Sequence, residues 1–336
     1  MLTDRPSEPV PEAAKRSLAT ALAAVPGLVV RSGEPLARYT TFRIGGPAEW
    51  LVDIPSQRAL LAVVRLAIGS GAPFHLLGLG SNVLIPDAGL PGIVGRLGGE
   101  LKRARVRGNL VSAGAALPLP QLARRMAGRG LLGLEALSGF PSTVGGAVCM
   151  NAGCYGTEIK DVLVSATVVE RDGTARRMTL AELEPAYRTT VLQRTGALVT
   201  RAVFRLRAGD APAAMARIDE LNKKRWASLP SGQPNAGSIF KNPPGDYAGR
   251  LIEACGLKGL AVGGAEISLK HANVIVNTGG ASAADVLALM LRARAAVGER
   301  FGVDLRPEVV LAGSLRAAWD RAGESGAIPV SPPDPT

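Results

Sequence analysis

The spacing of apolar residues along the chain predicts a mixture of helices and short strands. Ala-rich or amphipathic segments, one of them capped by Ser56, are typical of helices. We expect these helices over residues 12–25, 56–67, 119–129, 213–226, 248–254 and 283–301. Alternating or continuous apolar runs predict strands over residues 74–77, 162–170, 197–206, 274–276 and 303–311. Because strands and helices are mixed without a strict strand–helix repeat, the fold class indicated is α+β.

Length predicts about two domains, or three small ones, with the main boundary at residues 211–213. A chain of 336 residues is about twice the length of a common domain. We expect a loose tail and a helix over residues 1–37, and a large first domain over residues 38–210. A second domain, built from a strand–helix–strand unit, is expected over residues 211–314. Residues 315–336 are rich in Ala, Gly, Ser and Pro, which predicts a disordered tail.

Residues 138–156, SGFPSTVGGAVCMNAGCYG, form an uncharged stretch in a basic chain. A membrane-spanning helix needs about 20 mostly apolar residues, and Pro141 with the Gly pair that follows it would interrupt one. Glycine lets a backbone approach a ligand closely, and Ser142, Thr143 and Asn151 add short polar groups. The stretch is therefore predicted either to wrap around a phosphate-bearing ligand or to turn tightly inside the core.

A second Gly-rich turn follows the strand expected at residues 74–77. It reads Gly78-Leu79-Gly80-Ser81-Asn82, and main-chain amides in such a turn can hold a pyrophosphate. Val83 stands where the dinucleotide fingerprint GxGxxG needs its last glycine, and no Gly-Lys-Ser/Thr of a Walker loop follows. Two uncharged, Gly-rich loops in one chain together indicate a large nucleotide cofactor.

Composition narrows the class of protein. Hydrophobic residues make up 47% of the chain and aromatic residues 4%, which suits a soluble globular protein with an aliphatic core. The net charge of +11 comes from scattered basic residues, with residues 223–225 as the longest run. Aromatic residues are not interleaved with them as in single-strand binders. The positive field would favour anionic ligands such as nucleoside diphosphates.

Cysteine and histidine usage argues against a disulfide framework and a metal site. Cys149, Cys154 and Cys255 form no CxxC pair, and the chain has only two His residues. No secretory signal or long apolar run is recognised at the N-terminus. These features predict a protein of the reducing cytoplasm without membrane insertion.

Three polar residues are candidates for chemistry, and each has a plainer structural alternative. Ser238 lies in an Asn-Ala-Gly-Ser turn without a GxSxG elbow, so it is either a proton donor or an ordinary turn residue. Glu308 lies in an apolar strand, where it is either catalytic or paired with Arg306 or another Arg. Arg188 follows Tyr187 in a loop, where it either clamps a carboxylate or is simply solvated.

Five motifs, in this order and at this spacing, resemble the UDP-N-acetylenolpyruvoylglucosamine reductase (MurB) family. They are GLGSNVL, GFPSTVGGAVCMNAGCYG, AYRTTVLQ, NAGSIFKNP and RPEVVLAG, and the resemblance runs from about residue 39 to residue 313. It implies noncovalent FAD in a two-lobed flavin domain of the vanillyl-alcohol-oxidase (PCMH) type, over residues 38–210. A C-terminal α/β substrate-binding domain would cover the flavin. The shorter subclass of the family is the better match.

The resemblance also implies an activity. NADPH would reduce FAD and leave, and UDP-N-acetylglucosamine enolpyruvate would then occupy the same cleft and be reduced to UDP-N-acetylmuramate. This oxidoreductase step belongs to peptidoglycan synthesis in the bacterial cytoplasm, and so to cell-wall biogenesis, cell shape and cell division. We expect a monomer, with no nucleic-acid partner and no metal.

Residue roles carry over where the motifs match. Arg188 would stabilise the negative charge that develops on the substrate, Glu308 would assist in a partly protonated form, and Ser238 would donate a proton. Asn242 falls where the family contacts substrate, and we expect Lys241 to bind substrate beside it. Either Lys241 or bound water would help to polarise Ser238. The flavin loops contain Gly78, Gly80, Ser81, Asn82, Ser142, Thr143, Gly145, Gly146, Asn151 and Gly153.

The chain departs from the family at Phe140, Ser142 and Cys154, where Ile, Gly and Ala are commoner, and Cys154 would place a thiol near the flavin. Two competing interpretations stay open. One is a flavin oxidase of the same fold that acts on an alcohol or a lactone. Many such oxidases attach FAD through His or Cys near the first Gly loop, where only His75 lies. The other is a basic, non-catalytic nucleic-acid-binding protein, although no recognised binding motif supports it.

Overall fold

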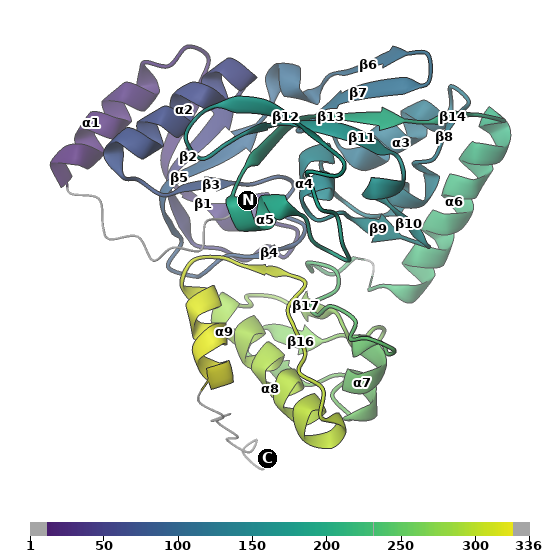
Figure 1. The fold of residues 1–336 in the computed structure, drawn as a ribbon. Helices are drawn as coiled ribbons and strands as arrows, with labels where there is room; N and C mark the ends of the chain where they lie inside the picture. The colour runs from purple at the N-terminus through teal and green to yellow at the C-terminus, as the bar shows by residue number, and fades with distance from the viewer. Residues whose placement is uncertain (1–11, 231, 325–336) are drawn as a thin grey trace.

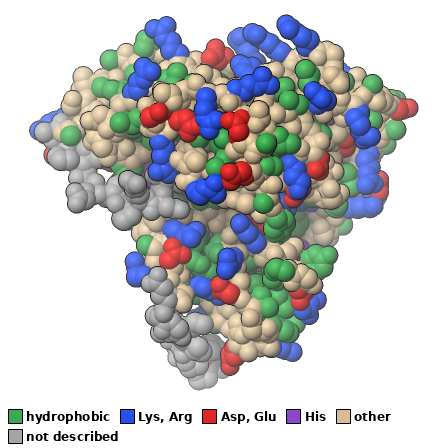
Figure 2. All heavy atoms as spheres, viewed as in Figure 1, with side chains coloured by type: hydrophobic (Ala, Val, Ile, Leu, Met, Phe, Trp, Pro, Cys, Tyr) green, Lys and Arg blue, Asp and Glu red, His purple; other side chains and the backbone are tan. Residues whose placement is uncertain are grey.

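The computed structural model describes residues 12–230 and 232–324. Figure 1 shows two lobes side by side above a smaller C-terminal domain. Figure 2 shows Lys and Arg side chains scattered over this face, with acidic side chains between them, rather than gathered in one stripe. Each of the three parts mixes helices and strands, as the sequence predicted.

The first lobe is a four-stranded sheet that carries two helices. The strand order is β1 (Val29–Pro35), β2 (Pro47–Ile54), β5 (Leu90–Leu97) and β3 (Phe74–Leu76), with β1 antiparallel to β2 and the other pairs parallel. Apolar faces of α1 (Glu12–Ala23) and α2 (Gln57–Ser70) bury Leu22, Leu60 and Val63 against the sheet. Ser56 Oγ accepts the Ala59 N–H at 3.1 Å, which confirms the predicted cap of α2.

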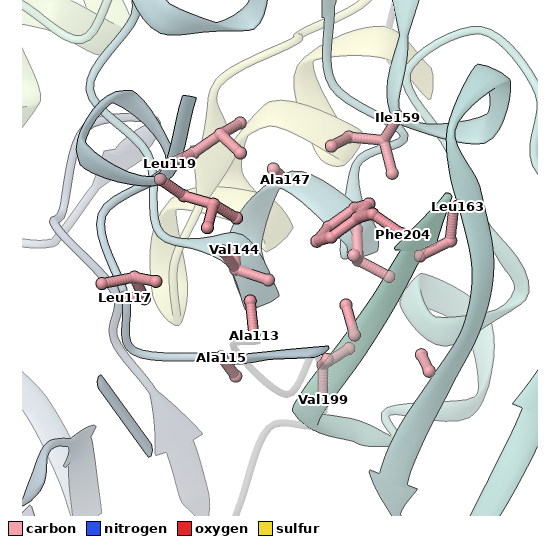
Figure 3. Close-up of a cluster of buried hydrophobic side chains, with 14 of the residues drawn as sticks. Ala113, Ala115, Leu117, Leu119, Val144, Ala147, Ile159, Leu163, Val199 and Phe204 are labelled. Carbon is pink, nitrogen blue, oxygen red and sulfur yellow. The ribbon is translucent and has the colours of Figure 1, made fainter. Parts of the chain in front are cut away.

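The second lobe is a five-stranded antiparallel sheet. Its order is β12 (Ala175–Thr179), β11 (Leu163–Val169), β13 (Leu198–Arg205), β7 (Leu110–Gly114) and β6 (Ala104–Arg107). Helices α3 (Leu119–Ala127) and α4 (Val144–Cys149) share its core. Figure 3 shows Val144 and Ala147 of α4 close to Ala113 and Phe204 of the sheet. This packing holds the uncharged stretch, residues 138–156, against a rigid support.

Short elements complete the two lobes. The helices are α5 (Val191–Thr195) and α6 (Ala211–Ser228), which leads to the C-terminal domain. The strand pairs are β8 (Leu131–Leu132) with β14 (Arg207–Ala208) and β9 (Gly153–Cys154) with β10 (Thr157–Glu158). The 3-10 turns are η1 (Leu36–Tyr39), η2 (Gly99–Lys102), η3 (Glu135–Gly139) and η4 (Ile159–Asp161).

The C-terminal domain packs three helices around a small antiparallel sheet. The strands are β15 (Ala261–Val262), β16 (Ala265–Ile267) and β17 (Ile275–Asn277), and the helices are α7 (Ala248–Ala254), α8 (Ala283–Phe301) and α9 (Ser314–Glu324). A capping box starts α8, with Asp285 N–H donating to Ser282 Oγ at 3.0 Å and Ser282 N–H donating to Asp285 Oδ2 at 2.9 Å. Strand β18 (Val310–Leu311) leaves the domain and pairs in parallel with β4 (Val83–Leu84) of the first lobe.

The C-terminal part corrects two predictions. Of residues 303–311, predicted as a strand, only Val310–Leu311 pair in a ladder, and their partner is β4 rather than a strand of a strand–helix–strand unit. Residues 315–324, predicted as part of a disordered tail, belong to α9, because Leu315 and Trp319 are buried in the domain core. Residues 325–336 lie outside the described residues.

The N-terminal segment also differs from its prediction. Residues 1–37 were expected to hold a tail and a helix, but β1 (Val29–Pro35) lies among them and pairs with β2 along its length. Gly33 and the terminal Pro35 obscure the strand pattern in the sequence. The loose tail predicted for residues 1–11 lies outside the described residues.

Acid is expected to destabilise the first lobe through His75. Its imidazole is 3% exposed in β3, and burial lowers its pKa from 6.5 to about 4. The folded state then binds fewer protons than the unfolded chain between these two values, so the free energy of unfolding falls as the pH drops through this window. Thermal melts across this range should show a shallower pH dependence for His75→Leu than for the wild type. An unchanged pH dependence in the variant would contradict the prediction.

Candidate functional site

A cleft of about 1160 Å³ lies where the two lobes meet the C-terminal domain. Its walls include the turn after β3, the uncharged stretch, the loop between α6 and α7, and the segment before β18. Pockets for small ligands span about 300–1,000 Å³. The cleft therefore has room for a large cofactor together with part of a second ligand.

Most of the site residues predicted from the sequence lie on the wall of this cleft. They come from both lobes and from the C-terminal domain. The first and the last of them, Gly78 and Glu308, are more than two hundred positions apart in the sequence. The predicted residues that line the cleft are Gly78, Gly80, Ser81, Asn82, Ser142, Thr143, Gly145, Gly146, Gly153, Arg188, Ser238, Lys241 and Glu308.

The turn at residues 78–82 offers main-chain donors to the cleft. Within the described part of the chain, the N–H groups of these five residues have no protein acceptor. Gly80 has a φ of +62°, and a Cβ there would collide with the carbonyl of Tyr39. Thr41 N–H donates to Gly80 O at 3.0 Å and fixes the turn. Consecutive free amides in such a turn can bind an anion, so the predicted pyrophosphate loop fits a nucleotide cofactor.

The two Gly-rich segments, predicted separately, lie side by side. A Cβ on Gly78 would lie 3.1 Å from Thr143 Oγ1, and Ser81 Oγ donates to Pro141 O. Asn82 Nδ2 also donates to Glu308 O at 3.1 Å, which ties the first turn to the C-terminal domain. The two segments therefore form one continuous surface of the cleft.

The uncharged stretch, residues 138–156, both lines the cleft and packs into the core, the two alternatives that its sequence left open. Its middle is the short helix α4, capped by Thr143 Oγ1, which accepts the Gly146 N–H at 3.2 Å. One side of α4 is buried in the core of the second lobe, as Figure 3 shows for Val144 and Ala147. Gly145 and Gly146 lie on the cleft side. A Cβ on Gly145 would lie 2.9 Å from the Ala115 side chain, so glycine permits close packing there.

Two of the predicted residues do not line the cleft. Asn151 is buried; its Nδ2 donates to Ala186 O at 3.0 Å and to Glu158 Oε2 at 3.1 Å, and its Oδ1 accepts the Lys160 N–H at 3.0 Å. Asn242 is exposed, and its Oδ1 accepts the Ala248 N–H at 3.1 Å at the start of α7. In the structure both side chains support the backbone around the cleft.

Arg188 and Glu308 meet in the cleft although 120 positions separate them. Arg188 Nε donates to Glu308 Oε1 at 3.1 Å and Nη2 donates to Gly153 O at 2.8 Å. The ion pair proposed for Glu308 is thus present, with Arg188 rather than Arg306 as partner. Burial raises the pKa of Glu308, and the Arg188 charge opposes that rise. The carboxyl group therefore keeps a proton to higher pH than an ordinary Glu.

The loop with Ser238 and Lys241 is hydrogen-bonded to the segment that carries Glu308. Glu308 N–H donates to Ile239 O at 2.8 Å, and Lys241 N–H donates to Arg306 O at 2.9 Å. Both Ser238 and Lys241 line the cleft. Burial lowers the pKa of Lys241, and no ion pair joins Lys241 to another described residue. A hydroxyl, a carboxyl and two cationic groups therefore face one cavity.

Other residues of the cleft were not predicted from the sequence. Gln193 of α5 lines the cleft, and its Nε2 donates to Arg188 O at 3.1 Å. Arg225 of α6 also lines it, with Nη1 3.6 Å from Cys154 Sγ, and Trp226 next to it is 65% exposed. Gln193 ends the motif AYRTTVLQ and Arg225 ends the longest basic run, but neither pattern alone distinguishes a site residue from a surface one.

Among the residues that the structure describes, no helix is long and apolar enough to cross a membrane. No group of three or more His, Cys, Asp or Glu side chains within residues 12–230 and 232–324 is placed to hold a metal ion.

Two family models match the chain. Residues 49–179 match an FAD-binding domain, and residues 229–312 match the C-terminal domain of UDP-N-acetylenolpyruvoylglucosamine reductase. UDP-N-acetylenolpyruvoylglucosamine reductase 2 of Symbiobacterium thermophilum is 47% identical over 284 residues, which are 84% of this chain and 92% of that protein. The chain belongs to the UDP-N-acetylenolpyruvoylglucosamine reductase (MurB) family. It is therefore a flavin-dependent oxidoreductase, as the motifs indicated.

Further members of the reductase family support the same conclusion. The Rubrobacter xylanophilus protein is 47% identical over 281 residues, 83% of this chain and 94% of its own. The crystal structure of the reductase from Thermus caldophilus superposes with a TM-score of 0.73 at 38% identity, covering 85% of this chain and 99% of that one. The predicted fold class, an α+β flavin domain with a C-terminal domain of the reductase type, is confirmed.

Proposed function

We propose that the chain reduces UDP-N-acetylglucosamine enolpyruvate to UDP-N-acetylmuramate, with NADPH as reductant and noncovalent FAD as cofactor. The observation that supports this most is the Arg188–Glu308 pair, which lines one cleft with Ser238 and Lys241. The relatives that share this fold carry the name of that reductase. In this function the protein is a monomeric, cytoplasmic enzyme of peptidoglycan synthesis.

FAD supplies the hydride when it is bound. The free amides at residues 78–82 would hold its pyrophosphate, and the glycines of α4 would let the isoalloxazine lie close to the backbone. Ser142 and Thr143 already bond within the chain, Ser142 Oγ donating to Thr143 O at 2.9 Å. Main-chain groups, more than these side chains, are therefore proposed to carry cofactor binding.

Arg188, Glu308 and Ser238 have distinct roles in this proposal. Hydride addition to the enolpyruvyl methylene carbon places negative charge on the adjacent carbon and on the substrate carboxylate. The Arg188 guanidinium stabilises that charge. Burial raises the pKa of Glu308, so in its partly protonated form it can donate a hydrogen bond to the carboxylate instead of repelling it. Ser238 delivers the proton to carbon, and the Lys241 cation lowers the cost of leaving its oxygen negative.

A flavin oxidase of the same fold is the second candidate, and His75 argues against its covalent form. His75 is 3% exposed and lies inside β3. It is not among the residues that line the cleft. A covalent flavin link at this position would require the strand to open.

Consumption of NADPH by the purified enzyme tests the proposed function. We expect NADPH oxidation to depend on the enolpyruvyl sugar nucleotide, and mass spectrometry should show a product heavier by two hydrogen atoms. An alcohol or lactone oxidase would instead consume oxygen and release hydrogen peroxide without this substrate. A protein without flavin that binds DNA with a steep salt dependence would support the nucleic-acid alternative.

A further inference from the structure

Arg188 is held in a backbone conformation that it would not adopt unaided. Its φ is +55°, in the left-handed region that disfavours a residue with a long side chain. The loop around it is closed by two main-chain bonds between Ala186 and Thr189, at 3.0 and 3.2 Å. Non-glycine residues stay in this region only when their surroundings hold them there. The contacts around Arg188 therefore identify the groups that position its guanidinium.

Gln193 makes the side-chain contact to the Arg188 backbone. Its Nε2 donates to Arg188 O at 3.1 Å and also lies 3.2 Å from Cys149 O and 3.1 Å from Met150 Sδ. These neighbours are all acceptors, which fixes which end of the amide is the nitrogen. Its Oε1 faces Thr189 Oγ1 at 3.5 Å. One carboxamide thus joins the Arg188 loop to the end of α4.

Two neighbouring side-chain hydrogen bonds also hold the Arg188 loop, but neither of them reaches the Arg188 carbonyl. Thr190 Oγ1 donates to Cys149 O at 2.7 Å, and Asn151 Nδ2 donates to Ala186 O at 3.0 Å. Both anchor the two ends of the loop to the segment at residues 149–151. Among the described side chains, only Gln193 donates to the carbonyl of Arg188 itself. The guanidinium is fixed at its other end by Glu308 and Gly153 O.

We propose that Gln193 is a positioning residue that holds Arg188 in its left-handed conformation, with the guanidinium on Glu308. This inference rests on the proposed function only for its effect on turnover. The position of Arg188 relative to Glu308 is a property of the chain itself. A purely structural Gln193 would change stability without acting through Arg188.

A double-mutant cycle separates these roles. Gln193→Met keeps the length of the side chain and removes its donors. We expect it to slow turnover about 10- to 100-fold, the effect of a displaced catalytic group, with little change in KM. In an Arg188→Ala background the same substitution should change turnover by less than about twofold, because its target is gone. Equal effects in both backgrounds would overturn the proposal.

Two further variants keep the cycle interpretable. Gln193→Glu has nearly the same shape but cannot donate to the Arg188 carbonyl, so it should reproduce the loss if Gln193→Met folds poorly. Arg194→Ala removes the next side chain of α5, which is exposed and pairs with Glu184 at 3.0 Å. Its turnover should stay within about twofold of the wild type, since exposed ion pairs contribute little.

The titration of Glu308 gives a readout that does not depend on activity. The cationic groups that face this carboxyl are Arg188, Lys241 and Arg225, and only Arg188 is tethered by Gln193. In Gln193→Met holoenzyme, the Glu308 ¹³C carboxyl resonance, assigned with Glu308→Gln, should titrate at higher pH than in the wild type. An unchanged titration would overturn the proposal. Wild-type turnover in Arg188→Ala would instead contradict the proposed function, and the titration would still decide the role of Gln193.

Discussion

Ser238→Ala is expected to leave reduction of the flavin by NADPH intact and to slow its re-oxidation by the enolpyruvyl substrate by about 10⁴-fold. This is the upper range for the loss of one general acid. Ser238 lines the cleft on a loop whose backbone is bonded to the Glu308 segment, so the substitution removes a hydroxyl without releasing the loop. Anaerobic stopped-flow absorbance measures the two half-reactions separately.

A matched control for this variant is Thr278→Ala. The Thr278 hydroxyl is exposed in the same domain and donates to Gly264 O at 3.0 Å, away from the lining of the cleft. Both half-reactions should stay within about twofold of the wild type. If Ser238→Ala slowed the two half-reactions equally, Ser238 would be a binding or structural residue and not the proton donor.

Arg188→Ala is expected to lower the rate of substrate reduction by about 10²–10³-fold, the usual cost of losing one group that stabilises developing charge. Arg188→Lys should recover little of this loss. The guanidinium holds Glu308 Oε1 through Nε and Gly153 O through Nη2, and a single ammonium cannot make both bonds in that geometry. Steady-state kinetics with the enolpyruvyl substrate measures the effect.

The same variant should alter the dependence of stability on pH. Without Arg188, burial raises the pKa of Glu308 further above its ordinary value of 4.5. The folded state then binds more protons than the unfolded chain above that pH, so the free energy of unfolding falls as the pH rises through the window. Arg306→Ala, which removes an exposed Arg near Glu308, is the control and should follow the wild type. Identical pH profiles for Arg188→Ala and Arg306→Ala would contradict this account of the ion pair.

Elements with a clear local signal could be predicted from the sequence. Helix α8 was predicted with its observed bounds from its long amphipathic pattern, and the structure adds the capping box of Ser282 and Asp285 at its start. The strand at β3 and the Gly-rich turn after it were also predicted. In each case the residues that decide the structure are neighbours in the chain.

Elements that depend on distant partners were predicted less well. Val310–Leu311 carry an apolar strand pattern, but the pattern does not say that the partner is β4 of the first lobe. Helix α9 was missed because its composition suggested disorder. In the structure the Trp319 and Phe240 ring centroids are 6.1 Å apart, and Arg294 Cζ lies 4.7 Å from the Trp319 ring centroid. Such contacts cannot be read from a local window.

The site shows the same division. A Gly-rich turn predicts free amides, and the structure has them at residues 78–82. Asn151 resembled a ligand donor because of its Gly-rich surroundings, yet its amide bonds to Ala186 O and Glu158. The meeting of Arg188 with Glu308 has no local signal at all. The family resemblance implied only that both residues act in one site, and their ion pair became visible only in the fold.

The most direct test of the proposed function is an anaerobic absorbance spectrum of the purified protein. We expect a flavin spectrum that bleaches with NADPH and returns in full when UDP-N-acetylglucosamine enolpyruvate is added without oxygen. A bleached flavin that stays reduced with this substrate would contradict the proposed reaction while leaving the flavin domain intact.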